Sequence, residues 1–422
     1  MCRNTQRRRA ALIEEGRRAQ RGPGPAVRAT LANSVLARSV VASAALAASG
    51  VASAANWEFA PRVEAGYRYS DNYHLSEPGA EIEVEGGEAD AQVTMRTVDP
   101  RTKIEITPRI EATYFPDQPA DDSVDYFLNA GVADQTPRRR MGVEGDFSRR
   151  DVARSELPDE ISGGLGDPVE GDSGRIVTRN KRNFFHVAPY FSYDVTQRQR
   201  VDVDAHYLQA EFDEQVEGIQ RDFSELGAAA GWGYLFSERS SLTLRGTVSQ
   251  YDTSRKTDAY GGYLEWGTRF TETSRMYVRA GAQQTKPEGG ESDTNLIAGI
   301  GGSWSRLRNT LFLDLTRTVE PVSAGTVVER YQLRMQIHHD VSPRLSLLLG
   351  ARGSHDEDIE DAGTFPTRKY AAADAGFEWR VLRDFAVTAT YNYRWQDYAD
   401  ELSDRSGNGF LIGVVYEPRR QD

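Results

Sequence analysis

Apolar and polar residues alternate along most of the chain after residue 56. Near the start, Val63 and Ala65 fall on one parity, and Arg62 and Glu64 fall on the other. Successive side chains of a β-strand point to opposite faces, so this pattern predicts strands with one apolar and one polar face. The same alternation recurs over 103–115 and continues to the end of the chain, which predicts an all-β protein.

Turns that are alternately short and long separate these segments, and counting them predicts about eighteen strands, with sixteen as the alternative. Short turns are expected at 99–102, 136–138, 196–198, 237–239, 272–274, 305–307, 341–343 and 382–383. Longer polar loops are expected near 71–90, 116–123, 150–181, 213–221, 252–258, 286–293, 319–326, 355–366 and 397–406.

This rhythm predicts a transmembrane antiparallel up-and-down β-barrel. Every backbone polar group must be paired inside a closed sheet when one face of that sheet meets lipid. Bacterial barrels have short turns on the periplasmic side and longer loops outside, so the long acidic loops are expected to face the exterior. The expected location is the outer membrane of a bacterial cell.

Aromatic residues support this topology, because they cluster near the ends of the expected strands. Rings with one polar edge prefer the two membrane–water interfaces. A soluble β-protein would also alternate, and a propeller would repeat about every 40 residues, but no such repeat runs through the chain. The expected girdle residues are Tyr67, Tyr69, Tyr114, Phe147, Tyr207, Tyr391, Tyr393 and Trp395 at one level, and Phe191, Tyr193, Trp232, Tyr234, Trp266, Phe270, Trp304, Phe377, Trp379 and Tyr416 at the other.

Residues 1–55 are expected to be a leader that contains a signal peptide, and residues 56–422 to be the barrel. A run of small and apolar residues, Val40–Val51, is followed by Ala52-Ser53-Ala54, the pattern that signal peptidase accepts. Cleavage is therefore expected near residue 54 or 55. The basic stretch before this run is too long for an ordinary signal peptide. Either the true start lies later, at Val27 or Leu31, or the long basic region is real.

Composition narrows the functional classes further. The mean hydropathy is −0.59, and no stretch after residue 55 reaches the roughly 20 apolar residues of a spanning helix. The single cysteine is Cys2, so no disulfide is expected. Without the leader, 42 basic and 61 acidic residues remain, a formal net charge of −19 that argues against nucleic-acid binding. No cofactor and no metal are expected.

The polar parity of the strands supplies the candidate pore lining. Basic and acidic side chains facing each other would orient ions and sugar hydroxyls, and aromatic rings would stack on pyranose faces. The alternative is a lattice of salt bridges that merely fills the barrel. The candidates are Arg245, Arg279, Arg334, Arg352, Arg394, Glu144, Asp202, Asp204, Tyr190, Tyr263, Tyr277 and Phe312.

No catalytic constellation stands out, so the chain is not expected to be an enzyme. His206 is the best candidate base, because Asp202 and Asp204 share its parity. A plain lumen-wall histidine is the alternative. The loop 150–181 is the longest and is expected to fold into the pore as a constriction. The acidic run 356–361 lacks the glycine of a calcium loop and is expected to be solvated or to bridge to lipopolysaccharide.

The segment Tyr67-Arg68-Tyr69-Ser70-Asp71-Asn72, with strand starts of the form Pro-x-apolar-x-apolar at Pro61, Pro108 and Pro189, resembles the β-barrel porin 2 family. That family is similar to outer-membrane proteins encoded with exopolysaccharide systems. The resemblance implies a barrel of the outer membrane and a link to polysaccharide passage. The chain departs from many barrels in that Tyr416 is followed by six more residues.

The expected function is passage of saccharides or small polar solutes through an outer-membrane channel. The expected partners are outer-membrane lipid, lipopolysaccharide, and exopolysaccharide or periplasmic export components. The alternative is a structural or assembly barrel that anchors surface polymer or periplasmic partners without conducting.

Overall fold

The computed structural model describes residues 57–97, 99, 101–155, 180–216, 220–359, 367–399 and 403–418. The expected leader, its cleavage site and most of the loop 150–181 lie outside these residues. Trp57–Asp422 forms one compact unit. Within the described part, no helix is long and apolar enough to span a membrane.

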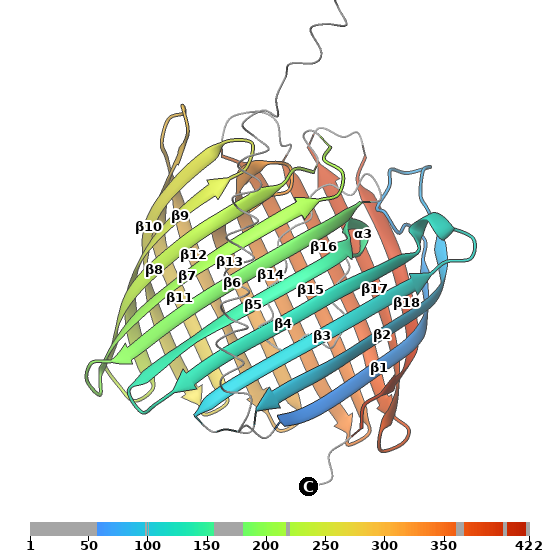
Figure 1. Ribbon diagram of the computed structural model, residues 1–422, viewed down its shortest axis with the longest axis horizontal. Coiled ribbons are helices and arrows are strands. Elements are labelled where there is room, and N and C mark those ends of the chain that lie inside the picture. The colour runs from blue at the N-terminus through green and yellow to red at the C-terminus, as the bar shows by residue number, and fades with distance from the viewer. Residues whose placement is uncertain are drawn as a thin grey trace, which may run out of the picture. The chain divides into compact units, whose positions relative to one another are not determined.

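Eighteen strands, all antiparallel to their neighbours, make up the described fold (Figure 1). The two short helical elements are η1 (Pro119–Asp121) and α3 (Val152–Ser155). The strands are β1 (Trp57–Ser70), β2 (Val84–Thr97), β3 (Thr102–Tyr114), β4 (Ser123–Gln135), β5 (Arg139–Asp151), β6 (Lys181–Asp194), β7 (Gln199–Phe212), β8 (Phe223–Leu235), β9 (Ser240–Asp252), β10 (Lys256–Thr271), β11 (Ser274–Pro287), β12 (Asp293–Arg306), β13 (Asn309–Val322), β14 (Thr326–Ser342), β15 (Leu345–Asp358), β16 (Arg368–Arg380), β17 (Phe385–Tyr398) and β18 (Arg405–Tyr416).

The sheet closes on itself. Each strand pairs with the next along the chain, and β1 also pairs with β18 from Val63↔Tyr416 to Ser70↔Gly409. Closure leaves no strand with an unpaired edge, which a sheet in lipid requires. The predicted eighteen-stranded up-and-down barrel is confirmed, and the sixteen-stranded alternative is wrong.

All eight predicted short turns separate consecutive strands, but three boundaries at the other end of the barrel differ from prediction. β2 begins at Val84 rather than near residue 91, because its inward polar residues pair with β1 in register. The expected long loops at 252–258 and 319–326 are three-residue turns, since the ladder continues through Asp252↔Lys256 and Val322↔Thr326. These strand ends are rich in polar residues, and the sequence pattern does not distinguish such residues from a loop.

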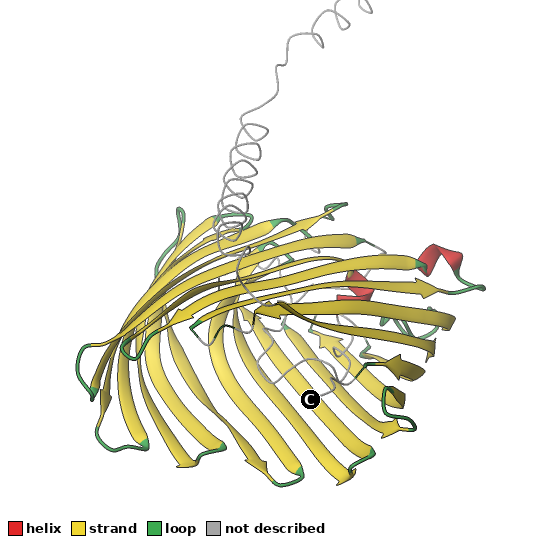
Figure 2. Ribbon diagram, turned by 60° about the horizontal axis from the view of Figure 1, so that its bottom comes forward, coloured by secondary structure: helices red, strands yellow, loops and turns green. Residues whose placement is uncertain are grey.

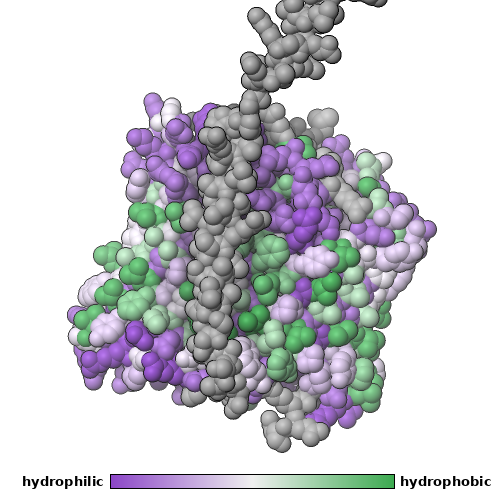
Figure 3. Space-filling view, viewed as in Figure 1, coloured by the Kyte–Doolittle hydropathy of each residue, from purple (hydrophilic) through white to green (hydrophobic). Residues whose placement is uncertain are grey.

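The outer face of the barrel is apolar at mid-height. Leu264, Leu315 and Leu349 are each nearly half exposed in the isolated chain, on the parity that faces away from the lumen. Figure 3 shows hydrophobic residues gathered across the middle of the visible face and hydrophilic ones toward its upper part. Exposed rings such as Tyr67, Trp232 and Trp379 lie near the strand ends, where the girdles were predicted. A surface of this kind suits a lipid environment.

Candidate functional site

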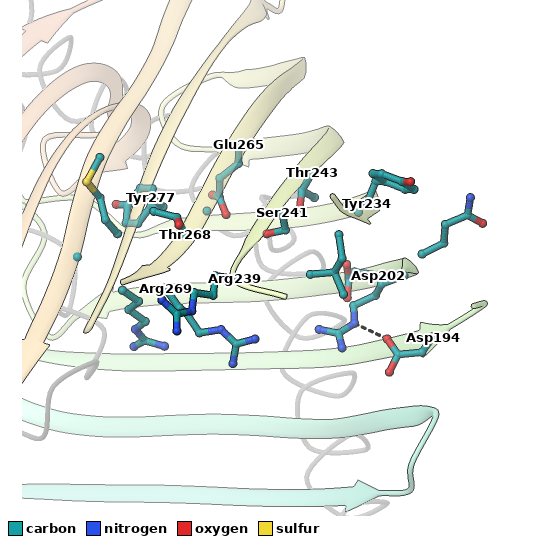
Figure 4. Close-up of a pocket in the computed structure, with 18 of the residues that line it drawn as sticks. Asp194, Asp202, Tyr234, Arg239, Ser241, Thr243, Glu265, Thr268, Arg269 and Tyr277 are labelled. Atoms are coloured by element: carbon teal, nitrogen blue, oxygen red, sulfur yellow. Dashed lines mark hydrogen bonds and ion pairs between the residues drawn. The ribbon is translucent and has the colours of Figure 1, made fainter. Parts of the chain in front are cut away.

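The polar faces of the strands line the inside of the barrel, and a cavity of about 580 Å³ lies against this wall at the short-turn end. Its walls come from β5 to β13, and Figure 4 shows the side chains around it. Among its described lining residues, Arg200 Nε and Asp194 Oδ1 form an ion pair at 2.7 Å. We call this cavity the vestibule; its charged lining residues are Arg140, Arg200, Arg239, Arg269, Arg275, Asp194, Asp202 and Glu265.

Tyr277 and Phe312, two of the predicted lining residues, border the vestibule. The tyrosine hydroxyl donates a hydrogen bond to Asp314, which also accepts one from Arg334 Nη2 at 3.5 Å. The Arg334 guanidinium carbon lies 5.9 Å from the centre of the Phe312 ring. A chain of aromatic, acidic and basic groups therefore runs from β11 to β14 along the inner wall.

Two glycines of β12 leave room for these side chains and for Arg279. A Cβ atom added to Gly301 would lie 2.7 Å from Asp314 Oδ2 and 2.8 Å from Tyr277 Cε1, which are too close for real contacts. A Cβ atom on Gly299 would lie 2.7 Å from Arg279 Nε. Because these positions have no side chain, groups from β11 and β13 lie over β12 and meet each other.

Arg279 is the centre of an aromatic pair. Its guanidinium carbon lies 5.8 Å from the centre of the Tyr263 ring and 5.7 Å from that of the Tyr277 ring. Distances of this size allow favourable cation–π attraction. The structure thus brings Tyr263 of β10 beside Tyr277 and Arg279, which lie two residues apart on the inward face of β11.

The remaining candidates on β5 to β9 are more dispersed. Arg245 forms an ion pair with Asp204, while Asp202 lines the vestibule. Tyr190 lies across Gly142, whose added Cβ would be 2.7 Å from the tyrosine oxygen, and Glu144 stays exposed to the lumen. Arg245 and Arg334 each have an acidic partner on a nearby strand, Asp204 on β7 and Asp314 on β13.

The arginines nearest the long-loop end are covered. Arg352 donates a hydrogen bond to the Tyr370 hydroxyl at 3.0 Å and lies over that ring. Arg394 faces inward as predicted, but only 1% of it is exposed, because its Nη2 donates to the backbone oxygens of Asn72 at 3.2 Å and Tyr73 at 3.1 Å. In this state Arg394 holds a chain segment and does not meet solute.

That segment, residues 71–83 between β1 and β2, folds into the barrel. Tyr73 and Leu75 are 1% and 0% exposed, and the Tyr73 ring meets Phe115 at 5.5 Å between centres. They belong to one apolar cluster, which we call the plug: Tyr73, Leu75, Val84, Phe115, Val152, Ala153, Phe184, Ala210, Phe212, Phe223, Tyr370 and Ala372.

The plug spans the lumen. Phe212 lies on β7 and Tyr370 on β16, which are nine strands apart in a closed order of eighteen and so lie on opposite walls. Residues 71–83 and α3 fill the distance between the two walls, and Figure 2 shows α3 within the ring of strands. Sequence reasoning missed this, because it expected the constriction from 150–181. Val152 and Ala153 contribute to it, and residues 156–179 lie outside the described part.

Polar contacts hold residues 71–83 against β17 and β18. Arg405 donates to Glu77 Oε1 at 3.0 Å, and the Asn72 amide donates to the Ser406 oxygen at 2.9 Å. His74 Nε2 lies 2.9 Å from Asp121 Oδ1, which ties the segment to η1. With Arg394, these contacts form what we call the latch.

The hydrolytic candidate has a different partner from the one predicted. His206 Nε2 lies 2.9 Å from Glu225 Oε1, whereas Asp204 is paired with Arg245. No serine is bonded to this histidine among the interactions described. Of the acidic run 356–361, Asp356 pairs with Arg330, and residues 360 and 361 lie outside the described part. The described residues contain no cluster that could hold a metal ion.

The vestibule residues that the sequence analysis missed follow the parity rule that it used. Arg140 shares the parity of Glu144, and Arg269 shares that of Tyr263. Asp314, which is bonded to Tyr277 but does not itself line the vestibule, shares the parity of Phe312. Applying the inward parity along the whole length of every strand would have found all three.

A closed barrel with an apolar outer band, aromatic rings near both rims and a polar interior defines a β-barrel protein of the bacterial outer membrane. No protein-family model and no curated protein matches the sequence.

Several solved structures are similar to the chain. Pseudomonas aeruginosa OccK2 (OpdF) in complex with glucuronate shares 10% identity over 86% of this chain and 98% of that one, with a TM-score of 0.45. OpdK of Pseudomonas aeruginosa with vanillate shares 10% identity over 85% of this chain and 98% of that one, with a TM-score of 0.45. Acinetobacter baumannii OccAB3 shares 8% identity over 85% of this chain and 99% of that one, with a TM-score of 0.44. Likeness this low carries no information about the lumen residues.

Proposed function

We propose that this protein is a non-enzymatic outer-membrane channel for saccharides or small polar solutes. The observation that carries the proposal is the vestibule, a polar cavity with aromatic residues along its edge inside a closed barrel. Sugars present hydroxyls that hydrogen-bond to charged side chains and apolar C–H faces that stack on rings. Tyr277 and Phe312 border this cavity, and Arg279 lies between Tyr263 and Tyr277.

We further propose that the passage serves export of exopolysaccharide, as the resemblance to the β-barrel porin 2 family implies. The vestibule lies at the short-turn end, which faces the periplasm in bacterial barrels. A polymer that leaves the cell would enter there. Partners in this role are exopolysaccharide and periplasmic export components, with lipid and lipopolysaccharide around the barrel.

A second candidate function is a structural barrel that anchors surface polymer without conducting. The plug favours it, because twelve buried apolar residues from both walls meet inside the lumen. Conduction separates the two candidates directly.

The test is single-channel current of the refolded mature chain in a planar bilayer, with and without an added oligosaccharide. We expect ohmic steps that the sugar blocks, and Tyr263→Ala and Tyr277→Ala should each weaken the block. The matched control is Tyr260→Ala. Tyr260 lies on β10, as Tyr263 does, but it is on the outer face and is 57% exposed. Block unchanged in both inward variants would contradict the saccharide proposal, and an inserted barrel that never conducts would favour the structural one.

A further inference from the structure

Arg279 differs from the other four candidate arginines. Arg245 and Arg334 have acidic partners, Arg352 donates to a tyrosine, and Arg394 donates to backbone oxygens. No residue of the described part accepts a hydrogen bond from Arg279 or forms an ion pair with it. Its guanidinium is therefore available to bind a ligand.

The geometry shows which atoms are available. The Nε atom of Arg279 is buried without a partner, whereas its two terminal nitrogens are not among the buried unpartnered atoms. The side chain is half-buried, so these terminal nitrogens face the lumen. Glu265 is directly opposite Arg279 in the β10–β11 register. The Arg279 side chain instead lies over Gly299 on the other side and forms no ion pair with Glu265.

Two rings complete the arrangement. The guanidinium lies within 6 Å of the centres of Tyr263 and Tyr277, and the second ring is fixed by the hydrogen bond from its hydroxyl to Asp314. Tyr277 also borders the vestibule, so a solute in that cavity lies beside this group. A guanidinium donates two parallel hydrogen bonds to a carboxylate, and adjacent rings bury one face of a pyranose.

We propose that Arg279, Tyr263 and Tyr277 form a binding site for a carboxylate-bearing sugar inside the lumen. This inference rests on the proposed function and narrows its substrate class. The terminal nitrogens of Arg279 bind the carboxylate, and the tyrosine rings contact the sugar ring. Asp314 does not oppose the carboxylate, since Tyr277 and Arg334 already engage it, whereas Glu265 is the acidic group whose charge the ligand must overcome.

The experiment measures equilibrium binding to the full refolded chain in detergent micelles, with galacturonate, galactose and acetate as probes. Charge-assisted hydrogen bonds predict that galacturonate binds about tenfold or more tightly than galactose. Arg279→Gln should remove this difference, and Arg279→Lys should restore part of it, because lysine keeps the charge but not the planar fork. Tyr263→Ala should weaken binding of galacturonate and leave acetate unchanged.

Glu265→Gln sharpens the test, since removing the opposing carboxylate should tighten galacturonate binding. Tyr260→Ala is the control on the outer face. Equal affinity for galacturonate and galactose, or a preference that survives Arg279→Gln, would overturn the inference.

Binding in micelles does not need an open pore, so the two proposals fail separately. A barrel that conducts and is blocked by neutral sugar but shows no galacturonate preference refutes this inference alone. A barrel that binds galacturonate but never conducts refutes the channel and leaves the site.

Discussion

The two ends of the barrel are built from the same eighteen strands but present opposite environments. At the short-turn end, the inward side chains leave a polar vestibule with five arginines. At the long-loop end, inward side chains are buried under chain that folds back into the lumen, with ion pairs such as Arg68–Glu88 and Arg330–Asp356 at under a tenth exposure. Strand alternation is the same in both regions, so the difference comes from what the connecting segments do.

The contrast shows how a barrel of this size controls access. Eighteen strands enclose a lumen wider than their own side chains fill, so segments between strands must supply any barrier. Here residues 71–83 and α3 bring apolar groups to meet Phe184, Phe212 and Tyr370. The vestibule is lined by strand residues and by the short turns at Thr196, Gln197 and Arg239, whereas residues 71–83 and α3 do not line it.

The largest expected effect comes from removing the plug. Replacing residues 71–83 with an Asn-Gly turn joins Ser70 to Val84, which already pair in register, and should raise single-channel conductance several-fold. The control replaces the β11–β12 connection, 288–292, in the same way, since none of its residues belongs to the plug. If both variants conduct like the parent, residues 71–83 are not the barrier.

The latch should have the next largest effect. Arg394→Met removes the donor to the Asn72 and Tyr73 oxygens, and two orphaned carbonyls cost about 1–3 kcal/mol each. Residues 57–422 contain no cysteine, so in a chain that starts at residue 57 Tyr73→Cys reports opening by its labelling rate without background. We expect that rate to rise about tenfold or more with Arg394→Met. Arg380→Met, at the short-turn end, is the control; an equal rise there would show general loosening.

At the vestibule, Gly301→Leu should displace Tyr277 from Asp314, because even a Cβ atom collides with both groups. Overpacking predicts a loss of about 1–3 kcal/mol in unfolding free energy and weaker block by sugar. Gly246→Ala is the control, since its added Cβ has only one neighbour, at 4.0 Å. Urea unfolding in detergent measures the first effect and bilayer current the second. Sugar block that persists in Gly301→Leu would show that the chain of contacts is not part of the site.

The smallest effect concerns a short turn. Backbone N–H groups of Thr102 and Arg101 donate to the Asp99 carboxylate at 3.0 and 2.7 Å and hold its pKa below the usual range. A lowered folded-state pKa gives stability that is present above the ordinary aspartate value, about 4, and is lost as the pH falls through the folded-state value. Asp99→Asn should reduce this pH dependence slightly, as the urea midpoint at pH 7 and pH 3 would show. If the Asp99 carboxylate does not contribute, the midpoint shift between those pH values will be the same in Asp99→Asn as in the parent.

Much of the fold was predictable because its signals are local. Alternation assigned Val63 to the outer face and Arg62 to the inner face, and each short turn was marked by its own residues. The ends of β2, β9 and β13 were not, because their polar residues pair across the sheet and look like loop in isolation. Parity also placed Tyr277 and Arg279 next to each other on the lumen wall, but it did not show that Tyr263 of the neighbouring strand lies against them.

The sequence by itself determined the barrel, a strand number of about eighteen, and the inward or outward direction of most strand side chains, because alternation depends on neighbours two residues apart. Only the tertiary structure decided what those side chains meet. Arg394 and Arg279 have the same inward parity, yet one holds residues 71–83 and the other lies between two rings beside the vestibule. Contacts of this kind join residues separated by up to several hundred positions. They depend on register, closure and the path of the connecting segments, which no local pattern contains.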